Sequence, residues 1–570
     1  MPVGPDEERE SSPKLGKAPA LVVGAALLVA LLGETALRSR ETPRRPPPSR
    51  TPPVAPITTS APVTTSAPRV DASSLATAVY QACAAKDLER ALALAEDAVA
   101  KAPEQAEPWL CRGHVHELRG DPGAAADARR ALEIDPGLVA ARELLVRSLW
   151  SAHDPTTIEA ASGLAEREPS NVLGWRVRAE ARLALGRDLE AALVDATRAH
   201  ELDPTTARDL RTRSALHEKL GRHADAAEDL AGALHLDGEN AGDLVALAAV
   251  RRAAGELKVA LESLSHAVEL EPSNADAWRE LGRARLDLDD AKDAVSDLER
   301  ATELGPRDAR AWTLLSRARD ARSEFEAAIA AADRALELDP GDARACHARA
   351  DARLNLADDD GALADYDRCV ALDPSFCWGW IGRGFARTVL GQNAAAVDDF
   401  RKGIALDRET GWLLSRIAEA QLATGAVDDA LATAERAVAV ERGSGFAWAA
   451  RGHARAEKGD LAGARADFDE AIRLKAFFVF VEQRGAARAK GGDLRGAIAD
   501  FDLAVECSRR ENPKNVQVRN ALAAAVARRG LAHEQLGEKA AAIADLEESL
   551  RMNPRSSAAD LARAALARLR

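Results

Sequence analysis

A regular spacing of prolines constrains this 570-residue chain more than any other feature. Four prolines are 34 residues apart, and each follows a leucine by two positions: Pro272, Pro306, Pro340 and Pro374. Units of similar length continue in both directions and the last one is longer, so that fourteen units close between Pro103 and Pro554. One unit of this length cannot bury its own apolar face, and neighbouring units must stack to form a continuous core. The spacing therefore predicts one long repeat array rather than several ordinary domains.

Each unit reads as a helix, a tight turn and a second helix. From Trp448 to Ala476 the sequence is WAARGHARAEKGDLAGARADFDEAIRLKA, and its apolar and small residues recur at helical spacing on either side of a Lys-Gly-Asp turn. Aromatic residues make up only 4% of the chain, although 46% of it is hydrophobic. The interior must therefore consist mostly of Ala, Leu and Val, which suits closely packed helices.

The unit resembles the tetratricopeptide repeat, whose pattern is W-x2-L-G-x2-Y, A-x3-F and a closing Pro over 34 residues. Two units match that pattern at many positions: Trp278, Gly282, Ala294, Leu298, Ala301 and Pro306 in one, and Trp380, Gly384, Ala396 and Phe400 in the other. The resemblance implies an all-α fold, an α-solenoid in which about fourteen helix-turn-helix repeats within residues 71–556 form a right-handed superhelix. It also implies a concave groove lined by the first helix of each pair. Residues 557–570 are expected to form a helix that caps the exposed end of the array.

Two positions of the unit carry a charged pattern of their own, when Trp is counted as position 4 and the closing Pro as position 32. Position 11, a Tyr in the family, is Arg in many units: Arg182, Arg251, Arg285, Arg319, Arg353, Arg387, Arg455 and Arg488. Where position 7 is Arg, position 23 is Asp: Arg112 and Asp127, Arg213 and Asp229, Arg349 and Asp365, Arg383 and Asp399, Arg451 and Asp467, Arg484 and Asp500, Arg529 and Asp545. Leu281 with Asp297 is the exception. We expect an Arg–Asp bridge between the two helices of a repeat, which contributes about 0–1 kcal/mol because the pair is partly exposed.

An uncharged stretch near the N-terminus predicts a membrane anchor. Residues 18–33, APALVVGAALLVALLG, contain no charge, and Leu15 and Glu34 can extend the stretch at its ends. A bilayer span needs about 20 apolar residues, so residues 18–37 are expected to form a transmembrane signal anchor behind an N-terminal tail of residues 1–17. A cleaved signal peptide and a buried apolar helix are the alternatives. The stretch is long for a signal-peptide core, and acidic residues precede it, which favours the uncleaved anchor.

The segment after the anchor predicts a tether. Residues 40–70 contain nine prolines and nine Ser or Thr, so residues 38–70 are expected to form a disordered linker. Three basic residues precede the anchor and five follow it closely: Arg9, Lys14 and Lys17 before it, and Arg38, Arg40, Arg44, Arg45 and Arg50 after it. By the positive-inside rule this difference favours a cytoplasmic repeat array. The linker composition favours an extracytoplasmic one, so the side of this single-pass membrane protein on which the array lies stays open.

The sequence contains no motif that is typical of a catalytic site. It lacks a P-loop, a nucleophile elbow, a zinc-protease motif and a dinucleotide-binding motif, and it has no convincing strands to hold them. Cys111, His114, His116 and Glu117 come nearest to a metal site, but no second ligand cluster accompanies them. The chain has 91 acidic and 77 basic residues and no basic run, which argues against nucleic acid as a partner. We therefore expect no enzyme activity, no catalytic residue, no metal and no cofactor.

The resemblance implies that positions 2, 5 and 9 of each first helix line the concave groove. In the middle units these positions hold five arginines: Arg279, Arg283, Arg310, Arg317 and Arg344. In the later units they hold four aromatic residues: Trp378, Phe385, Trp412 and Phe446. Arginine and aromatic residues dominate binding hot spots, so we expect the groove to bind a protein segment with an acidic and an apolar part. In the alternative interpretation, the rings pack against neighbouring repeats and the arginines pair with nearby acids.

Together these features favour a non-enzymatic scaffold, tethered to a membrane, that binds a partner peptide or helix in the groove of its repeats. Two alternatives stay open. In the first alternative, the chain is a secreted or periplasmic assembly factor released by signal cleavage. In the second, it is an accessory recruiting subunit of an enzyme complex. The repeats do not specify the partner.

Overall fold

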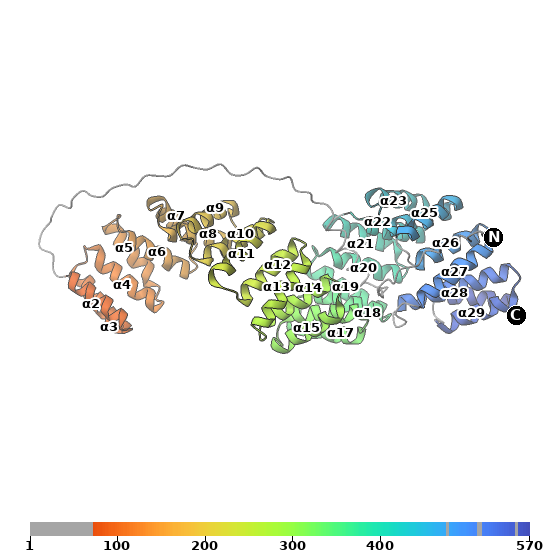
Figure 1. Cartoon of the computed structure of the whole chain (residues 1–570), viewed down its shortest axis with the longest axis horizontal. Helices are drawn as coiled ribbons and strands as arrows, with labels where there is room; N and C mark the ends of the chain where they lie inside the picture. The colour runs from red at the N-terminus through yellow and green to blue at the C-terminus, as the bar shows by residue number, and fades with distance from the viewer. Residues whose placement is uncertain (1–71, 408, 475–477, 510–515, 553–556) are drawn as a thin grey trace, which may run out of the picture. The chain divides into compact units, whose positions relative to one another are not determined.

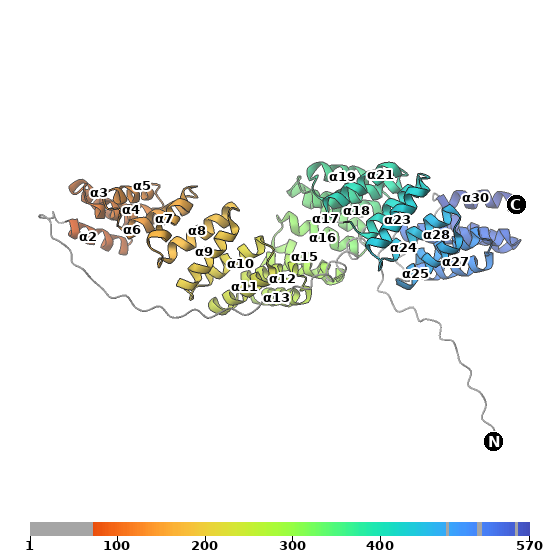
Figure 2. The same cartoon turned by 90° about the horizontal axis from the view of Figure 1, so that it is seen from above.

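The computed structural model describes residues 72–407, 409–474, 478–509, 516–552 and 557–570. Every regular element within these residues is an α-helix (Figure 1 and Figure 2), which confirms the all-α prediction. The chain divides into two compact units, whose described residues are 72–277 and 278–570. Each unit is an array of helical hairpins.

The unit before residue 278 contains six hairpins: α2 (Ala72–Ala84) with α3 (Leu88–Lys101), α4 (Ala106–Arg119) with α5 (Gly123–Ile134), α6 (Val139–Ser151) with α7 (Thr157–Arg167), α8 (Val172–Leu185) with α9 (Leu189–Leu202), α10 (Ala207–Lys219) with α11 (His223–Asp237), and α12 (Ala241–Ala253) with α13 (Leu257–Leu270).

The unit from residue 278 onward contains eight hairpins and a last single helix: α14 (Ala275–Asp287) with α15 (Ala291–Leu304), α16 (Ala309–Ala321) with α17 (Phe325–Leu338), α18 (Ala343–Asn355) with α19 (Asp359–Leu372), α20 (Cys377–Val389) with α21 (Asn393–Leu406), α22 (Gly411–Ala423) with α23 (Val427–Val440), α24 (Gly445–Lys458) with α25 (Leu461–Leu474), α26 (Phe478–Lys490) with α27 (Leu494–Ser508), α28 (Val516–Gln535) with α29 (Lys539–Met552), and α30 (Ser557–Leu569). Helix α30 packs on α28 and α29. The fourteen described hairpins agree with the predicted number of repeats.

The first helices of the hairpins form the inner side of each array. In the later unit, α16 contacts α18, α18 contacts α20, and α22, α24, α26 and α28 form a continuous row of contacts. Among the described residues, the second helices make no comparable contacts with one another. The first helices are therefore the more closely spaced layer, as on the concave side of a curved stack of hairpins.

One hydrogen bond between consecutive repeats explains why Trp and Pro recur together. The indole Nε1 of Trp380 donates to the main-chain carbonyl oxygen of Pro374 at 3.0 Å. The same bond joins Trp109 to Pro103, Trp175 to Pro169, Trp312 to Pro306, and Trp448 to Arg442. Proline follows the end of a second helix because it cannot continue that helix. The indole bond then holds the next first helix against that end.

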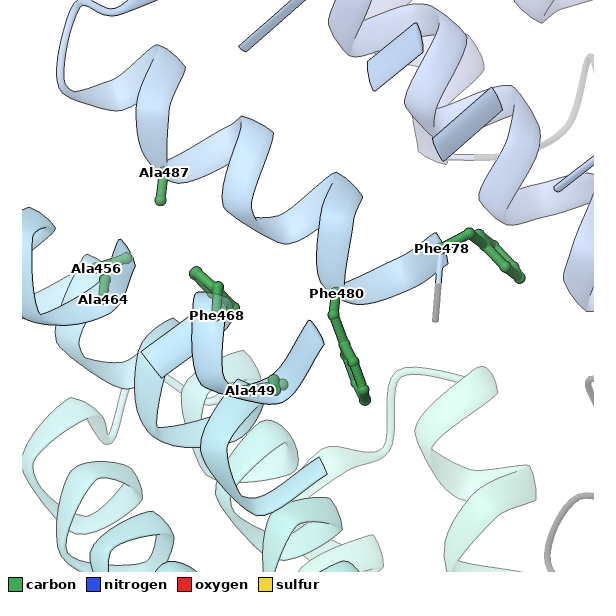
Figure 3. Packing of buried hydrophobic residues seen from close by; sticks show 8 residues of the cluster. Ala449, Ala456, Ala464, Phe468, Phe478, Phe480 and Ala487 are labelled. Atoms are coloured by element: carbon green, nitrogen blue, oxygen red, sulfur yellow. The ribbon is translucent and has the colours of Figure 1, made fainter. Parts of the chain in front are cut away.

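Alanine fills most of the core, and rings fill the gaps that alanine leaves. Ala294 and Ala301 are buried between α14 and α15, and a Cβ atom on Gly282 would lie only 2.5 Å from Cγ of Leu298. Near the C-terminal end, Figure 3 shows the rings of Phe468 and Phe480 among small alanine side chains. Close helix approach therefore needs the small residues that the composition provides.

The predicted Arg–Asp bridge is present in all seven repeats that have the pattern. Between α20 and α21, Arg383 donates from Nε and Nη2 to the two oxygens of Asp399 at 2.9 and 2.7 Å, and Arg387 donates to the same carboxylate at 2.6 Å. The other six pairs form the same bridge: Arg112–Asp127, Arg213–Asp229, Arg349–Asp365, Arg451–Asp467, Arg484–Asp500 and Arg529–Asp545.

The small predicted contribution assumed a partly exposed pair, and the structure contradicts that assumption for the aspartate. Asp399 is only 1% exposed, and the aspartates of the other six bridges are also buried. A buried carboxylate must be paired and hydrogen-bonded, because removing one partner leaves a charge away from water. The bridge is therefore a buried structural element of each repeat.

Asp297 is the exception in the structure as well as in the sequence. Leu281 occupies position 7 of its repeat, so no arginine reaches Asp297 from that position. Nη1 of Arg285 lies 2.7 Å from Oδ2, yet this oxygen has no hydrogen-bond partner among the described residues. Burial raises the pKa of Asp297 from 3.8 to about 7, against the opposing effect of Arg285 and with help from the charges of Asp293 and Asp290.

Replacing Asp297 with asparagine should remove part of the pH dependence of stability. Between about pH 4 and about pH 7 the folded state holds a proton on Asp297 that the unfolded chain has lost, so the native free energy of unfolding falls as pH rises. An asparagine at this position cannot titrate. We expect Asp297→Asn to be more stable than the native chain at about pH 8, with a smaller difference at about pH 5, by thermal unfolding.

A matched change shows whether this effect is specific to Asp297. Asp365 occupies the same repeat position but is held by Arg349 and Arg353. Asp365→Asn should therefore destabilise the chain at about pH 8. If Asp297→Asn shifted the unfolding temperature equally at both pH values, the unusual titration of Asp297 would be contradicted.

No helix in the described part of the chain is long and apolar enough to cross a bilayer. The predicted anchor of residues 18–37, the tail of residues 1–17 and the linker of residues 38–70 lie outside the described residues. They stay predictions.

Candidate functional site

The inner face of the first helices from α14 to α24 carries every residue predicted to bind a partner. We call it the inner face from here on. It falls into an arginine part on α14, α16 and α18 and an aromatic part on α20, α22 and α24. Both parts belong to the unit that starts at residue 278.

The aromatic part is a set of half-buried rings that touch one another. Phe385 lies 5.7 Å from the ring of Trp412 and 5.2 Å from that of Phe400, measured between centroids. Trp378, Phe385 and Trp412 all pack against one buried cluster between α20, α21 and α22. These three rings therefore contribute to the core and also keep part of their surface on the inner face. Their role in binding stays a prediction.

Phe446 continues the aromatic part on α24. Its ring meets that of Phe480 edge to face at 5.2 Å, and the guanidinium carbon of Arg416 lies 5.4 Å from its centroid. Nη1 of Arg416 also pairs with Glu419 at 2.9 Å. A cation above the outer ring face makes this end amphipathic, able to contact an apolar side chain next to a polar group.

Two of the five predicted arginines already have acidic partners. Arg279 on α14 donates from Nη1 to Oδ2 of Asp308 at 2.7 Å and from Nε to Oε1 of Glu280 at 3.2 Å. Arg283 lies 3.9 Å from Glu280. These contacts hold α14 to the start of α16, as the alternative of pairing with nearby acids predicts for these two residues.

The other three arginines differ from these two. Arg310 and Arg344 stand near the starts of α16 and α18 with exposed side chains. Arg317 lies two turns further along α16 and is only partly exposed. Within the described residues, none of the three guanidinium groups has a hydrogen bond or ion pair with a carboxylate.

A buried polar network lies beside Arg317, and the sequence interpretation missed it. The hydroxyl of Tyr366 on α19 donates to Oδ1 of Asp351 on α18, and Nδ1 of His347 lies 3.1 Å from Oδ2 of Asp351. One turn away, Nδ2 of Asn355 donates to Oδ1 of Asp320 on α16 at 3.0 Å. The network joins α16, α18 and α19 under the arginine part of the inner face.

One part of this network could have been found in the sequence. His347 and Asp351 occupy positions 5 and 9 of their repeat, which are the positions expected to line the groove. Asp320 and Asn355 stand in the last turns of their helices, where polar residues usually face solvent, so no sequence signal identifies them. Tyr366 lies on a second helix, and its bond to Asp351 depends on how the two helices pack.

Burial shapes the charges of this region. It raises the pKa of Asp320 to about 7, helped by the nearby charge of Asp351. It lowers the pKa of Arg317 against the opposing charges of Asp287, Asp351 and Asp320, and Arg344 lowers it further. An arginine keeps its proton at neutral pH in proteins, so Arg317 is a cation in a partly dry setting.

No group of three or more His, Cys, Asp or Glu side chains within the described ranges is placed to hold a metal ion. Cys111, the residue nearest to a metal motif in the sequence, is buried, and burial raises the pKa of its thiol to about 11. His114 instead lies 3.1 Å from Glu117, and His116 lies 3.3 Å from Asp121. These side chains contribute to local packing of α4.

Two repeat profiles, both described as tetratricopeptide repeat, match parts of the chain: residues 245–309, 279–343, 343–376 and 523–556. These segments are tetratricopeptide repeats. Together with the hairpins described above, they establish the predicted fold class, an all-α solenoid of helix-turn-helix repeats. No curated protein matches the sequence.

Several solved structures are similar to the chain. The structure titled "APC/C hetero-tetramer Cut9-Hcn1" matches at 15% identity and a TM-score of 0.45, over 87% of this chain and 97% of that one. A tetratricopeptide repeat protein from Parabacteroides merdae ATCC 43184 matches at 19% identity and a TM-score of 0.36, over 41% and 93%. YrrB, titled a TPR protein with an unusual peptide-binding site, matches at 23% identity and a TM-score of 0.29, over 34% and 98%.

Proposed function

We propose that this chain of tetratricopeptide repeats is a non-enzymatic scaffold that binds protein segments on its inner face. The observation that carries the proposal is that Arg310, Arg317 and Arg344 have no acidic partner among the described residues and lie on the same row of first helices as half-buried aromatic rings. A protein of formal net charge −14 has ample acidic residues to neutralise its arginines, as Arg279 illustrates. Arginines without such a partner in the described structure, on the same row of helices as partly exposed rings, fit an interaction surface.

The two parts of the inner face suggest the character of the bound segment. The arginine part attracts acidic side chains, and the aromatic part of Trp378, Phe385, Trp412 and Phe446 offers apolar surface. A segment with an acidic and an apolar portion would contact both. We further propose that residues 18–37 tether the scaffold to a membrane, which rests on the uncharged sequence of residues 18–33.

Reversing the charge of two exposed arginines should weaken partner capture without unfolding the chain. Arg310→Glu with Arg344→Glu removes two cations that make no ion pair in the described structure, so stability should change by about 0.5 kcal/mol or less. Capture of protein partners by the full chain should fall by about tenfold or more, because like charges would then face an acidic segment. Affinity capture read by mass spectrometry measures this change.

The second helices that directly precede α16 and α18 supply a matched control. Arg300 and Arg334 are exposed on the second helices α15 and α17, where each pairs with a glutamate one turn away. Arg300→Glu with Arg334→Glu changes the net charge equally but leaves the inner face intact. If both double variants captured the same partners as the native chain, the inner face would not be the binding surface.

A further inference from the structure

The junction between the first helices α16 and α18 buries two carboxylates that no arginine holds. Among the described residues, fourteen Asp or Glu side chains are buried, and twelve of them lie within ion-pair distance of an arginine. The two exceptions are Asp320 on α16 and Asp351 on α18. A buried carboxylate without a cation is costly unless it is hydrogen-bonded or takes up a proton.

Other side chains of the junction hold these two carboxylates. Nδ2 of Asn355 on α18 donates to Oδ1 of Asp320 at 3.0 Å, so this hydrogen bond links α18 to α16. Oδ1 of Asp351 accepts from the hydroxyl of Tyr366, and Oδ2 of Asp351 lies 3.1 Å from Nδ1 of His347. Among the described residues, Asp351 therefore has two partners and Asp320 has one, so Asp351 is the better stabilised anion.

The surroundings of Asp320 disfavour its ionised form. Burial, together with the charge of Asp351, raises the pKa of Asp320 from 3.8 to about 7. The hydrogen bond from Asn355 and the nearby His347 and Arg317 act in the opposite direction. Asp320 thus keeps a proton at pH values at which an ordinary aspartate is ionised.

Most ionisable groups on the adjoining helices have other partners. They form ion pairs of their own: Arg319 with Glu299 of α15, Arg322 with Glu324 before α17, and Arg349 of α18 with Asp365 of α19. Asp287 of α14 and Arg344 of α18 act on Arg317. Burial raises the pKa of Tyr366 and keeps that side chain neutral. Histidine is a residue type that changes charge near neutral pH, so a test must separate His347 from Asp320.

We propose that the junction between α16 and α18 is a pH-sensitive joint, which a proton on Asp320 keeps closed. With the proton bound, Asp320 is a neutral acid, and the two carboxylates carry one negative charge, on Asp351. When the proton leaves to solvent, both carboxylates are negative and neither has an arginine in ion-pair contact. Asn355 is uncharged and cannot cancel the second charge. The two helices then separate locally and admit water.

The joint lies in the row of first helices, so its opening changes the spacing of the inner face at one place. Arg317 stands on one side of the joint and Arg344 on the other. This inference goes beyond the proposed function, because the joint opens or closes whether or not a partner binds.

Rising pH should open the joint. Between about pH 4 and about pH 7 the closed state keeps a proton on Asp320 that the open, hydrated state loses. Higher pH therefore favours the open state, until the closed state has lost the proton as well. From about pH 6 to about pH 8 the opening equilibrium should shift by about tenfold.

Hydrogen exchange of the full chain in detergent micelles tests the joint. Backbone exchange is followed by mass spectrometry at about pH 6 and about pH 8, and each rate is divided by the intrinsic rate of an unfolded peptide at the same pH. Peptides from α16 and α18 should then exchange about tenfold faster at the higher pH. Peptides from α24 and α25 should not change, because Arg451 and Arg455 hold Asp467 there. Equal corrected rates in α16 and α18 at both pH values would overturn the proposal.

Two substitutions identify the proton. In Asp320→Asn, which resembles the protonated acid, α16 and α18 should exchange at the same corrected rate at both pH values. Asp351→Asn removes the neighbouring negative charge, so Asp320 should ionise at lower pH in the closed state. The difference between the two pH values should then shrink, and this result is informative even if Asp320→Asn failed to fold.

Two further variants separate Asp320 from other groups that titrate in this range. His347→Gln and Asp297→Asn both leave Asp320 in place, so each should keep the faster exchange of α16 and α18 at the higher pH. A difference that vanished in either variant and persisted in Asp320→Asn would assign the proton elsewhere and overturn the proposal. An equal increase in every helix of the native chain would also overturn it, because global unfolding and not one joint would then respond to pH.

Discussion

Replacing Arg383 with leucine should lower the free energy of unfolding by about 3 kcal/mol, the lower end of the usual cost of removing one partner of a buried charge, because Arg387 remains on Asp399. Arg383 donates two hydrogen bonds to Asp399 and a third, from Nη1, to Asp367 of the preceding repeat at 2.8 Å. Its guanidinium carbon also lies 4.6 Å from the ring centroid of Trp380. The substitution removes all these contacts at once and leaves Asp399 with Arg387 alone. Urea unfolding of the full chain, followed by circular dichroism, measures the loss.

Another repeat of the chain shows which second substitution should restore the stability of this variant. In the repeat of α12 and α13, positions 7 and 23 are Leu247 and Ser263, and Nη1 of Arg251 at position 11 donates to the hydroxyl of Ser263 at 2.8 Å. Arg383→Leu with Asp399→Ser should reproduce that arrangement and recover most of the stability. The free energy of unfolding should be higher for the double variant than for the single variant, because the double variant no longer buries an incompletely paired carboxylate.

A surface pair provides the comparison. Arg401 lies 3.8 Å from Asp398, and both side chains are more than half exposed to solvent. Arg401→Ala should change the free energy of unfolding by no more than about 1 kcal/mol. An Arg383→Leu chain that unfolded at the urea concentration of the native chain would show that the bridge contributes no more than such a surface pair.

The Arg–Asp bridge shows what a repeat sequence can predict. Arg383 and Asp399 recur together at the equivalent positions of other repeats in the same chain, so the pattern identifies the pair without a structure. The strength of the pair depends on how deeply Asp399 is buried, and burial comes from the packing of α20 on α21. The sequence therefore predicts the contact correctly but not how deeply its carboxylate is buried.

The arginines of the inner face show where sequence reasoning stops. Arg279 and Arg344 both lie at positions expected to line the groove, but Arg279 pairs with Asp308 from the next repeat and Arg344 has no acidic partner in the described structure. The difference depends on which acid the next hairpin brings alongside, 29 residues later in the case of Asp308. The position of a residue in the repeat predicts which face of the helix it lies on. Its ion-pair partner depends on how two neighbouring hairpins stack.

For the aromatic residues, the repeat position likewise does not predict how much of each ring packs in the core. Trp378 and Trp412 hold the same repeat position, and the resemblance places both on the inner face. In the structure both rings also pack against the buried cluster that includes Phe400. A Trp→Ala change at either position would therefore lose core contacts as well as surface, so the exposed arginines are the better test of binding.

Replacing Gly382 with alanine should lower the free energy of unfolding by about 3 kcal/mol, at the upper end of what overpacking in a core usually costs. A Cβ atom at this position of α20 would lie 2.2 Å from Cε1 of Tyr366 and 2.8 Å from Cδ1 and Cζ of the same ring. The ring cannot retreat easily, since it is fully buried and its hydroxyl is bonded to Asp351. The added methyl must therefore displace Tyr366 or separate α20 from α19. Thermal unfolding of the variant and the native chain measures the cost.

The matched change is Gly163→Ala in helix α7, where nothing lies within 4 Å of the added Cβ atom. Alanine has the higher helix propensity, so this variant should gain about 0.5–1 kcal/mol. The two substitutions add the same methyl group and differ only in the atoms that surround it. The informative result is therefore whether each substitution raises or lowers the free energy of unfolding. A Gly382→Ala variant as stable as the native chain would contradict this prediction, because it would mean that the Tyr366 ring can move aside.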